Sequence, residues 1–421
     1  MSRRVRRAVL VLLLAATLAA GALVVQLNLQ GEAPLDADAA VPGADPAQIA
    51  RGAYLARAGH CAGCHTERGG APYAGGRGLA TPFGTVYASN LTPDEATGLG
   101  RWSAAEFRRA LRHGRSRDGR LLYPAFPYAN YTLVADADAD AMFAYLRSLP
   151  PVAQPNRGHA LRFPYGTQAA LAVWRALNFR AARFEPDPAR PEDWNRGAYL
   201  VQGLGHCSAC HAARDALGAS ADGLRGGLIP VQNWYAPALD DPREAGVADW
   251  PLEDIVALLR TGRAPQATTL GPMAEVVLGS TRHLGEADLR AIAVYLKSLP
   301  QAAPRAVAAT ARPTPRGAAL YEKHCAACHG EQGEGAAGAY PALAGHRAAM
   351  LEPAANLVRV VLEGGFAPAT EGHPRPYGMP PFATELDDRD VAAVLDHVKS
   401  SWGNAGSAVS PLDVLRWRGS R

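Results

Sequence analysis

The longest apolar stretch of the chain lies near its N-terminus. Eighteen consecutive uncharged, mostly apolar residues run from Ala8 to Val25, preceded by Arg3, Arg4, Arg6 and Arg7. A basic start before an apolar run is typical of an export signal, but this run is long enough to span a bilayer. No small-x-small cleavage site precedes Gln26. We expect residues 1–30 to be an uncleaved anchor, or alternatively a cleaved signal, with the body outside the cytoplasm because the arginines favour the inner side.

Apolar residues recur at helical spacing in six further stretches that form three pairs. The first helix of each pair ends before a glycine that suits a helix C-cap. These helices are predicted at Ser103–His113, Leu252–Thr261 and Ala355–Glu363. The second helix opens with acidic residues and carries a basic residue in its last turn, as the helix dipole favours. These are predicted at Asp136–Leu149, Glu286–Leu299 and Asp387–Ser400.

The chain repeats this pattern three times, which predicts an all-α, loop-rich fold of three tandem helical domains. A related Arg-Gly-Ala motif begins each repeat, at Arg51, Arg196 and Arg316. The predicted divisions are a signal or anchor at 1–30, a tether at 31–45, domains at 46–152, 190–301 and 316–404, linkers at 153–189 and 302–315, and a polar tail at 405–421. Aromatic residues in the first linker, such as Phe163 and Phe179, predict that it packs.

Composition excludes several classes of protein. A length of 421 residues suggests two to four domains, and 48% hydrophobic residues exclude long intrinsic disorder. The net charge of +4 is too slight for a nucleic-acid-binding chain recognised by charge. The chain contains no dinucleotide-binding fingerprint after a strand and no defensible nucleophile–base constellation, so we expect no catalytic residues.

All six cysteines fall in three Cys-x-x-Cys-His motifs, and none is left over. The motifs are Cys61-Ala-Gly-Cys64-His65, Cys207-Ser-Ala-Cys210-His211 and Cys325-Ala-Ala-Cys328-His329. Two thiols on one turn can add to the two vinyl groups of a haem, and the adjacent histidine then becomes the proximal iron ligand. We therefore predict three covalent haem c groups in three cytochrome c-type domains, with His65, His211 and His329 as axial ligands.

A zinc site, a disulfide and a thioredoxin-type redox pair are the alternatives. Zinc would require further Cys or His pairs at matching spacings, and a redox pair would not need a histidine in all three copies. The haem interpretation explains every cysteine.

The sixth iron ligand is expected on the loop before each closing helix, where methionine is a common choice. Met273 and Met379 occupy such positions in the second and third domains. The first domain has Phe126 in the corresponding stretch and no sulfur. Met142 and His113 are weak candidates there, since Met142 is expected in the core and His113 at the surface. The sixth ligand of the first haem stays open.

These motifs resemble the triheme cytochrome c subunit of bacterial membrane-bound gluconate, sorbitol, fructose and alcohol dehydrogenases. The resemblance covers nearly the whole chain after residue 46. It is carried by Thr81-Pro82-Phe83-Gly84, Asn90-Leu91-Thr92-Pro93-Asp94, Gly205-His206-Cys207, Met379-Pro380-Pro381-Phe382 and Ser401-Trp402-Gly403-Asn404. It implies that Met273 and Met379 are axial ligands. In many family members a methionine stands where Phe126 lies, and the Phe-Pro-Tyr variant is similar to subunits serving molybdenum aldehyde or N-heterocycle dehydrogenases.

The resemblance implies an electron-transfer subunit that is not an enzyme on its own. Its partner would be a flavin, PQQ or molybdenum dehydrogenase subunit on the periplasmic face of the inner membrane, and its acceptor membrane ubiquinone. Two alternatives stay open: a haem enzyme or ligand-binding cytochrome that uses an open first haem, and a carrier that docks directly to a terminal oxidase.

Overall fold

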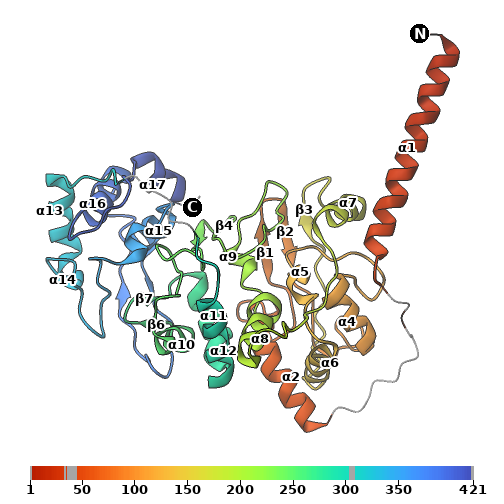
Figure 1. Cartoon of the computed structure of the whole chain (residues 1–421), viewed down its shortest axis with the longest axis horizontal. Helices are drawn as coiled ribbons and strands as arrows, with labels where there is room; N and C mark the ends of the chain where they lie inside the picture. The colour runs from red at the N-terminus through yellow and green to blue at the C-terminus, as the bar shows by residue number, and fades with distance from the viewer. Residues whose placement is uncertain (1, 33–34, 36–44, 303–308, 419–421) are drawn as a thin grey trace. The chain divides into compact units, whose positions relative to one another are not determined.

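The computed structural model describes residues 2–32, 35, 45–302 and 309–418 (Figure 1). Most of the predicted tether at 31–45 and residues 303–308 of the second predicted linker lie outside the described residues. The chain divides into two compact units. One comprises Met1–Ala56 and Cys64–Glu185, and the other Arg57–Gly63 and Pro186–Arg421. The fold is mainly helical, but short antiparallel strand pairs correct the all-α expectation.

The first unit contains the N-terminal helix and the elements of the first repeat; the end of α2 and the start of α3 fall in the Arg57–Gly63 segment of the second. Its helices are α1 (Arg3–Leu29), α2 (Pro46–Ala58), α3 (Cys61–His65), α4 (Ala104–His113), α5 (Tyr128–Tyr131), α6 (Asp136–Arg147) and α7 (Gln168–Asn178). Its strands are β1 (Gly78–Thr81), β2 (Gly84–Tyr87) and β3 (Ala160–Leu161), which form one antiparallel sheet in the order β1-β2-β3.

The second unit contains the second and third repeats. The second repeat comprises α8 (Glu192–Ala198), the π-helix η1 (Tyr199–Leu204), α9 (Ser208–His211), β4 (Gly227–Ile229), β5 (Trp234–Ala236), α10 (Leu252–Thr261), β6 (Arg263–Ala264), β7 (Ala267–Thr268), α11 (Pro272–Gly279), η2 (Thr281–His283) and α12 (Glu286–Lys297). The third comprises α13 (Pro315–His324), α14 (Ala326–His329), η3 (Arg347–Met350), α15 (Ala355–Glu363), β8 (Gly365–Phe366), β9 (Gly378–Met379), α16 (Asp388–Ser400) and α17 (Pro411–Trp417).

In every repeat the opening helix crosses the closing helix at a glycine. A Cβ atom built on Gly52 would clash with the carbonyl of Ala141 in α6. The same clash would occur in the other repeats, between Gly197 and Ala291 and between Gly317 and Ala393. Only glycine allows the two backbones to approach this closely, which explains why Arg-Gly-Ala begins each repeat.

The arginine before each of these glycines ties the two helices together at their ends. Arg196 makes two parallel hydrogen bonds of 2.8 Å with the carboxylate of Asp288, in the first turn of α12. The equivalent pairs are Arg51–Asp138 and Arg316–Asp390. Each of the three repeats therefore has one such ion pair and one such glycine crossing, formed by residues at equivalent positions.

The middle helices match their predicted ranges closely. The ranges Leu252–Thr261 and Ala355–Glu363 are observed as predicted, and α4 begins one residue after Ser103, which caps it in a capping box with Glu106. Each helix ends at a glycine with positive φ, at Gly114, Gly262 and Gly364. The side-chain-free residue permits this backbone conformation and ends the helix.

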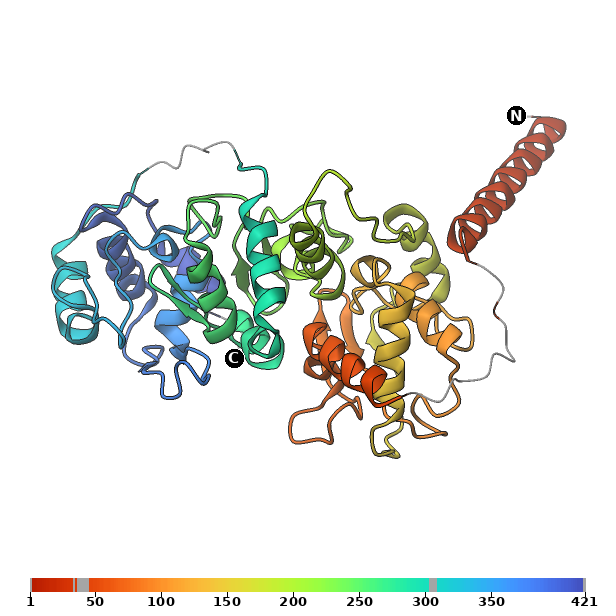
Figure 2. The same cartoon turned by 60° about the horizontal axis from the view of Figure 1, so that its bottom comes forward.

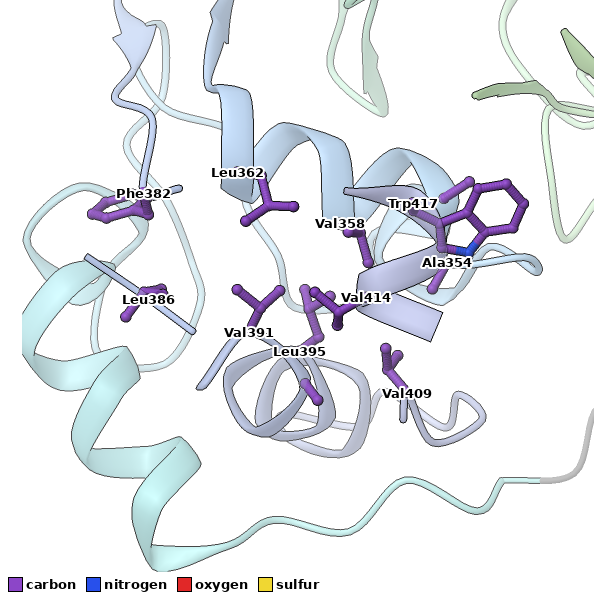
Figure 3. Packing of buried hydrophobic residues seen from close by; sticks show 12 residues of the cluster. Ala354, Val358, Leu362, Phe382, Leu386, Val391, Leu395, Val409, Val414 and Trp417 are labelled. Atoms are coloured by element: carbon purple, nitrogen blue, oxygen red, sulfur yellow. The ribbon is translucent and has the colours of Figure 1, made fainter. Parts of the chain in front are cut away.

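The part of the chain predicted as a polar tail contains a packed helix. Figure 3 shows Val414 and Trp417 of α17 against the hydrophobic core of the third repeat, beside Val358 and Leu395. Ser410 and Asp413 form a capping box that begins α17. Residues 405–418 therefore pack as part of the third repeat and do not form a separate tail.

The predicted packed linker at 153–189 is only partly buried. Its strand β3 extends the sheet of the first unit, and Phe179 is buried after α7. Phe163, however, is 88% exposed, so it does not contribute to the packing for which it was cited.

Helix α1 is the one helix among the described residues that is long and apolar enough to cross a membrane. Figures 1 and 2 show it as one continuous helix, and none of its residues is buried.

Candidate haem-binding site

The three Cys-x-x-Cys-His motifs lie on single helical turns directly after the opening helices. Helix α3 contains the whole first motif, whereas Cys207 and Cys325 are the N-cap residues of α9 and α14, which contain the rest of the second and third motifs. A separation of three residues places the two thiols of each motif on one side of the turn. All six cysteines are half-buried free thiols. Each motif can therefore present two thiols and the following histidine to one planar group.

The histidine of each motif is oriented by a backbone carbonyl from a distant loop. The Nδ1 atom of His65 lies 2.7 Å from the carbonyl oxygen of Ser89, and that of His211 lies 2.7 Å from that of Pro237. His329 makes the same contact with Pro341 at 2.9 Å. A carbonyl only accepts hydrogen bonds, so Nδ1 carries the proton and Nε2 keeps its lone pair. Such a partner fixes the tautomer and ring orientation of a metal-ligating histidine.

Burial keeps these imidazoles neutral. It lowers the pKa of His65, His211 and His329, and in each case the carbonyl hydrogen bond acts in the opposite, weaker direction. A neutral imidazole is the form that binds iron. The three histidines thus favour the form that axial ligation would require, and their ligation of iron stays a prediction.

The cysteines do not have the properties of the alternative sites. Burial raises the pKa of Cys207 to about 12 and that of Cys325 to about 11. A redox-active Cys-x-x-Cys pair needs a lowered thiol pKa, so the surroundings of Cys207 and Cys325 are the opposite of a thioredoxin-type site. Over the described part of the chain, no group of three or more His, Cys, Asp or Glu side chains could hold a metal ion. Thiol addition to a haem fits these residues better than zinc binding.

Met379 and Met273 are half-buried at the positions expected for sixth ligands. Met379 lies in β9, opposite Gly365, and packs against the core of the third repeat. Met273 is the second residue of α11. The helix is preceded by Gly271, whose φ of 55° and close approach to the Trp234 ring require a glycine. Their ligation of iron stays a prediction.

The structure aligns Phe126 with Met273. After the C-capping glycine of each middle helix, Arg115 pairs with Leu121 in the first repeat and Arg263 pairs with Thr268 in the second. Phe126 lies five residues after Leu121, and Met273 lies five residues after Thr268. The ring of Phe126 packs 5.3 Å from that of Tyr131. An aromatic side chain therefore stands where the second repeat has a thioether.

The two weak candidates for the first haem lie in other surroundings. Met142 is 2% exposed inside α6, as expected of a core residue. His113 was expected at the surface, but it is buried at the end of α4. Burial lowers the pKa of His113, and the charges that act on it come from Glu32, Arg112, Arg115 and Arg175.

A histidine also precedes the first cysteine of every motif, a feature that sequence reasoning missed. His60 and His206 both have positive φ, and burial lowers the pKa of His206 to about 4. His324 instead lies 3.7 Å from the carboxylate of Glu385. The shared His-Cys order was a visible signal, but the different surroundings of the three side chains could not be read from it.

The Cys-x-x-Cys-His motifs of the repeats and the comparison with known proteins both identify the chain as a c-type cytochrome. The cytochrome c family model matches residues 49–150 and 315–402. The chain is 38% identical to the cytochrome c subunit of a quinone-dependent alcohol dehydrogenase from Gluconacetobacter polyoxogenes, over 90% of this chain and 86% of that protein. It is also 38% identical to the gluconate 2-dehydrogenase cytochrome c subunit of Pantoea cypripedii, over 89% and 90% of the two chains.

A third relative differs in length. A nicotinate dehydrogenase subunit from Pseudomonas putida is 42% identical over 83% of this chain, but the match spans 30% of that protein. The chain belongs to the family of cytochrome c subunits of membrane dehydrogenases. It is accordingly an electron-transfer subunit rather than a catalytic one, and family membership implies covalent haem c.

Proposed function

We propose that this chain carries three covalent haem c groups and passes electrons from a periplasmic dehydrogenase subunit to ubiquinone in the membrane. The observation that carries the proposal is the threefold arrangement of two thiols and a carbonyl-oriented histidine. A bound haem would supply a one-electron Fe(III)/Fe(II) couple. The protein would hold the three groups through Cys61/Cys64, Cys207/Cys210 and Cys325/Cys328, with His65, His211 and His329 as proximal ligands.

The partner is proposed from the relatives. Their names include alcohol, gluconate and fructose dehydrogenase subunits and a nicotinate dehydrogenase subunit. These support a catalytic partner of the flavin, PQQ or molybdenum type. Substrate oxidation by such a partner releases two electrons and two protons, and reduction of ubiquinone to ubiquinol consumes the same number.

Two measurements test this function. The purified chain should contain three haems by the pyridine haemochromogen assay, and replacement of both Cys325 and Cys328 by alanine should leave two. Gentle solubilisation from native membranes should co-purify a stoichiometric dehydrogenase subunit, identified by mass spectrometry. A chain recovered alone from membranes that oxidise the substrate would contradict the proposed partnership.

A further assay identifies whether the electron acceptor is ubiquinone or a terminal oxidase. The purified complex should reduce a short-chain ubiquinone analogue with substrate, and quinone-site inhibitors should block this. If quinone-site inhibitors have no effect and a terminal oxidase oxidises the reduced chain directly, the chain would instead be a carrier that docks to the oxidase.

A ligand-binding role for the first haem is a second candidate, favoured by Phe126 at the position of Met273. Carbon monoxide binding to one ferrous haem would support an open position. Turnover of peroxide by the purified chain would be needed to make it an enzyme.

A further inference from the structure

We propose that helix α7 lies in the membrane surface and forms a second contact with the bilayer beside α1. The proposal rests on the anchoring role of α1. The partner that would cover the exposed face of α7 is the lipid of the leaflet from which α1 emerges.

Helix α7 has a buried face and an exposed apolar face. Leu171, Arg175 and Ala176 are buried against the first unit. Leu177 is 69% exposed and Val173 is 48% exposed, although both are large aliphatic residues one helical turn apart. Water would disfavour this face, whereas the hydrocarbon boundary of a bilayer would bury it.

The end of α1 is attached directly to α7. The side-chain amide of Asn28 donates to the carbonyl oxygen of Ala172 at 2.9 Å, and Arg175 Nε donates to Asn28 Oδ1 at 3.0 Å. Arg115 donates to the main-chain carbonyl of Asn28 at 3.1 Å. Asn28 also lies where the apolar run of α1 gives way to polar residues. The two helices therefore meet at the level where a membrane-spanning α1 would leave the hydrocarbon.

This attachment is supported from within the first unit. Arg175 is 3% exposed, packs over the rings of Tyr128 and Phe179, and donates to the carbonyl of His113 at 2.7 Å. Glu32, just after α1, makes an ion pair with Arg115 at 2.9 Å. A buried arginine held by so many groups fixes α7 relative to the end of α1. If α1 spans the bilayer, Val173 and Leu177 therefore lie at the membrane interface beside its end.

The charge of the surrounding segment fits an anionic lipid surface. Residues 162–184 contain no aspartate or glutamate, and three of their four arginines are exposed: Arg162, Arg180 and Arg183, the last of which pairs with Asp136. Basic residues beside an apolar helical face favour binding to anionic headgroups. Phe163, 88% exposed just before α7, adds an apolar side chain of a kind found on the lipid-facing side of interfacial helices.

The test uses single introduced cysteines in the full-length, haem-loaded chain. Its native cysteines would all be consumed by haem, so an added thiol is the one reactive site. Leu177→Cys, Leu14→Cys in α1 and Ala96→Cys in an exposed loop of the same unit are placed in vesicles of phosphatidylethanolamine and phosphatidylglycerol. Each is reacted with a membrane-impermeant sulfonated maleimide. Val173→Cys replaces Leu177→Cys if that variant loses a haem.

We expect the thiol at 177 to react at least tenfold more slowly than the thiol at 96, and the thiol at 14 to be protected. If 14 is protected but 177 reacts as fast as 96, the α7 contact is wrong while the anchor stands. If 14 itself reacts, the anchor proposal fails. Protection of 177 that requires an added dehydrogenase subunit would show that protein, not lipid, covers this face.

Discussion

At the scale of single residues, the orientation of the histidine in each Cys-x-x-Cys-His motif depends on a carbonyl far along the chain. The acceptors lie 24, 26 and 12 residues after His65, His211 and His329. The motif itself was predictable because its five residues are contiguous. The acceptors were not, because they depend on how the long glycine-rich loops return to the motif.

We expect Met379→Ala to convert one haem to the high-spin form while the haem count stays at three. Loss of a thioether ligand should also lower the potential of that haem by tens to hundreds of millivolts, within the roughly 0.8 V range set by axial ligands. Visible spectra and a redox titration measure both effects. Met350→Ala, in η3, is the control. Unchanged spectra in the Met379 variant would remove this residue as a ligand.

We expect Phe126→Met to close the first haem. The wild-type ferrous protein should bind carbon monoxide at one haem, since the aromatic ring at Phe126 cannot ligate iron, and the variant should bind it at none. Carbon monoxide difference spectra count the binding haems. Leu122→Met adds a sulfur to the same loop at a different offset and should leave binding unchanged. Absence of binding in the wild type would show that another group already occupies the position.

His113 shows why burial was harder to predict than chemistry. It is the last residue of an amphipathic helix, at the edge of a loop, which suggested a position at the surface. Arg175, 62 residues away in sequence, covers this end of the helix through its bond to the His113 carbonyl. Such burial depends on the linker folding back, which no local pattern encodes.

At the scale of helices, the repeated Arg-Gly-Ala motif was visible in the sequence. The close helix crossing that requires its glycine was not predicted. The sequence predicted the ranges of α10 and α15 because periodicity and the C-capping glycine are local. The π-helix η1 escaped prediction. It absorbs the one residue by which the second repeat exceeds the first: Arg196 and Cys207 are eleven positions apart, against ten between Arg51 and Cys61 and nine between Arg316 and Cys325.

Gly197→Ala should destabilise the second repeat. The added methyl would lie 2.0 Å from the carbonyl oxygen of Ala291, so α8 and α12 would have to separate. We expect a loss of about 1–3 kcal/mol in the free energy of unfolding, the usual cost of overpacking. Urea denaturation measures it. Gly158→Ala, where no atom lies within 4 Å of the added carbon, is the matched control. Equal stabilities of the two variants would contradict the close crossing.

Deletion of Gln202 should be tolerated. Removing one residue from η1 gives the second repeat the spacing of the first, and the turn can then become α-helical. The lost hydrogen bond from Gln202 to the Tyr295 hydroxyl should cost about 1 kcal/mol. We expect three haems per chain to remain. Deletion of Ala319 from the regular helix α13 should instead rotate the third motif by about 100° and remove its haem. Loss of the second haem on deletion of Gln202 would show that the π-turn itself is required.

At the scale of the whole molecule, α1 packs differently from the three repeats. No residue of α1 is buried, whereas each repeat has its own helix crossing and histidine contact. Length and hydrophobicity were enough to predict the helix. Its attachment through Asn28 was not predictable, because the partner carbonyl lies 144 residues further on.

Replacement of Arg3–Val25 by a cleavable secretory signal should therefore yield a soluble protein with its three haems intact. The design keeps Asn28 and Glu32, so their contacts with Arg175 and Arg115 survive. We expect the visible spectrum and haem count of the wild type, but at least tenfold less substrate-driven ubiquinone reduction in membranes, since the chain would no longer be held beside its acceptor. Fusion of an unrelated membrane-spanning helix at Gln26 should restore the activity. If reduction stays at the wild-type rate without any spanning helix, even after a high-salt wash, then α1 is not what couples this cytochrome to the membrane.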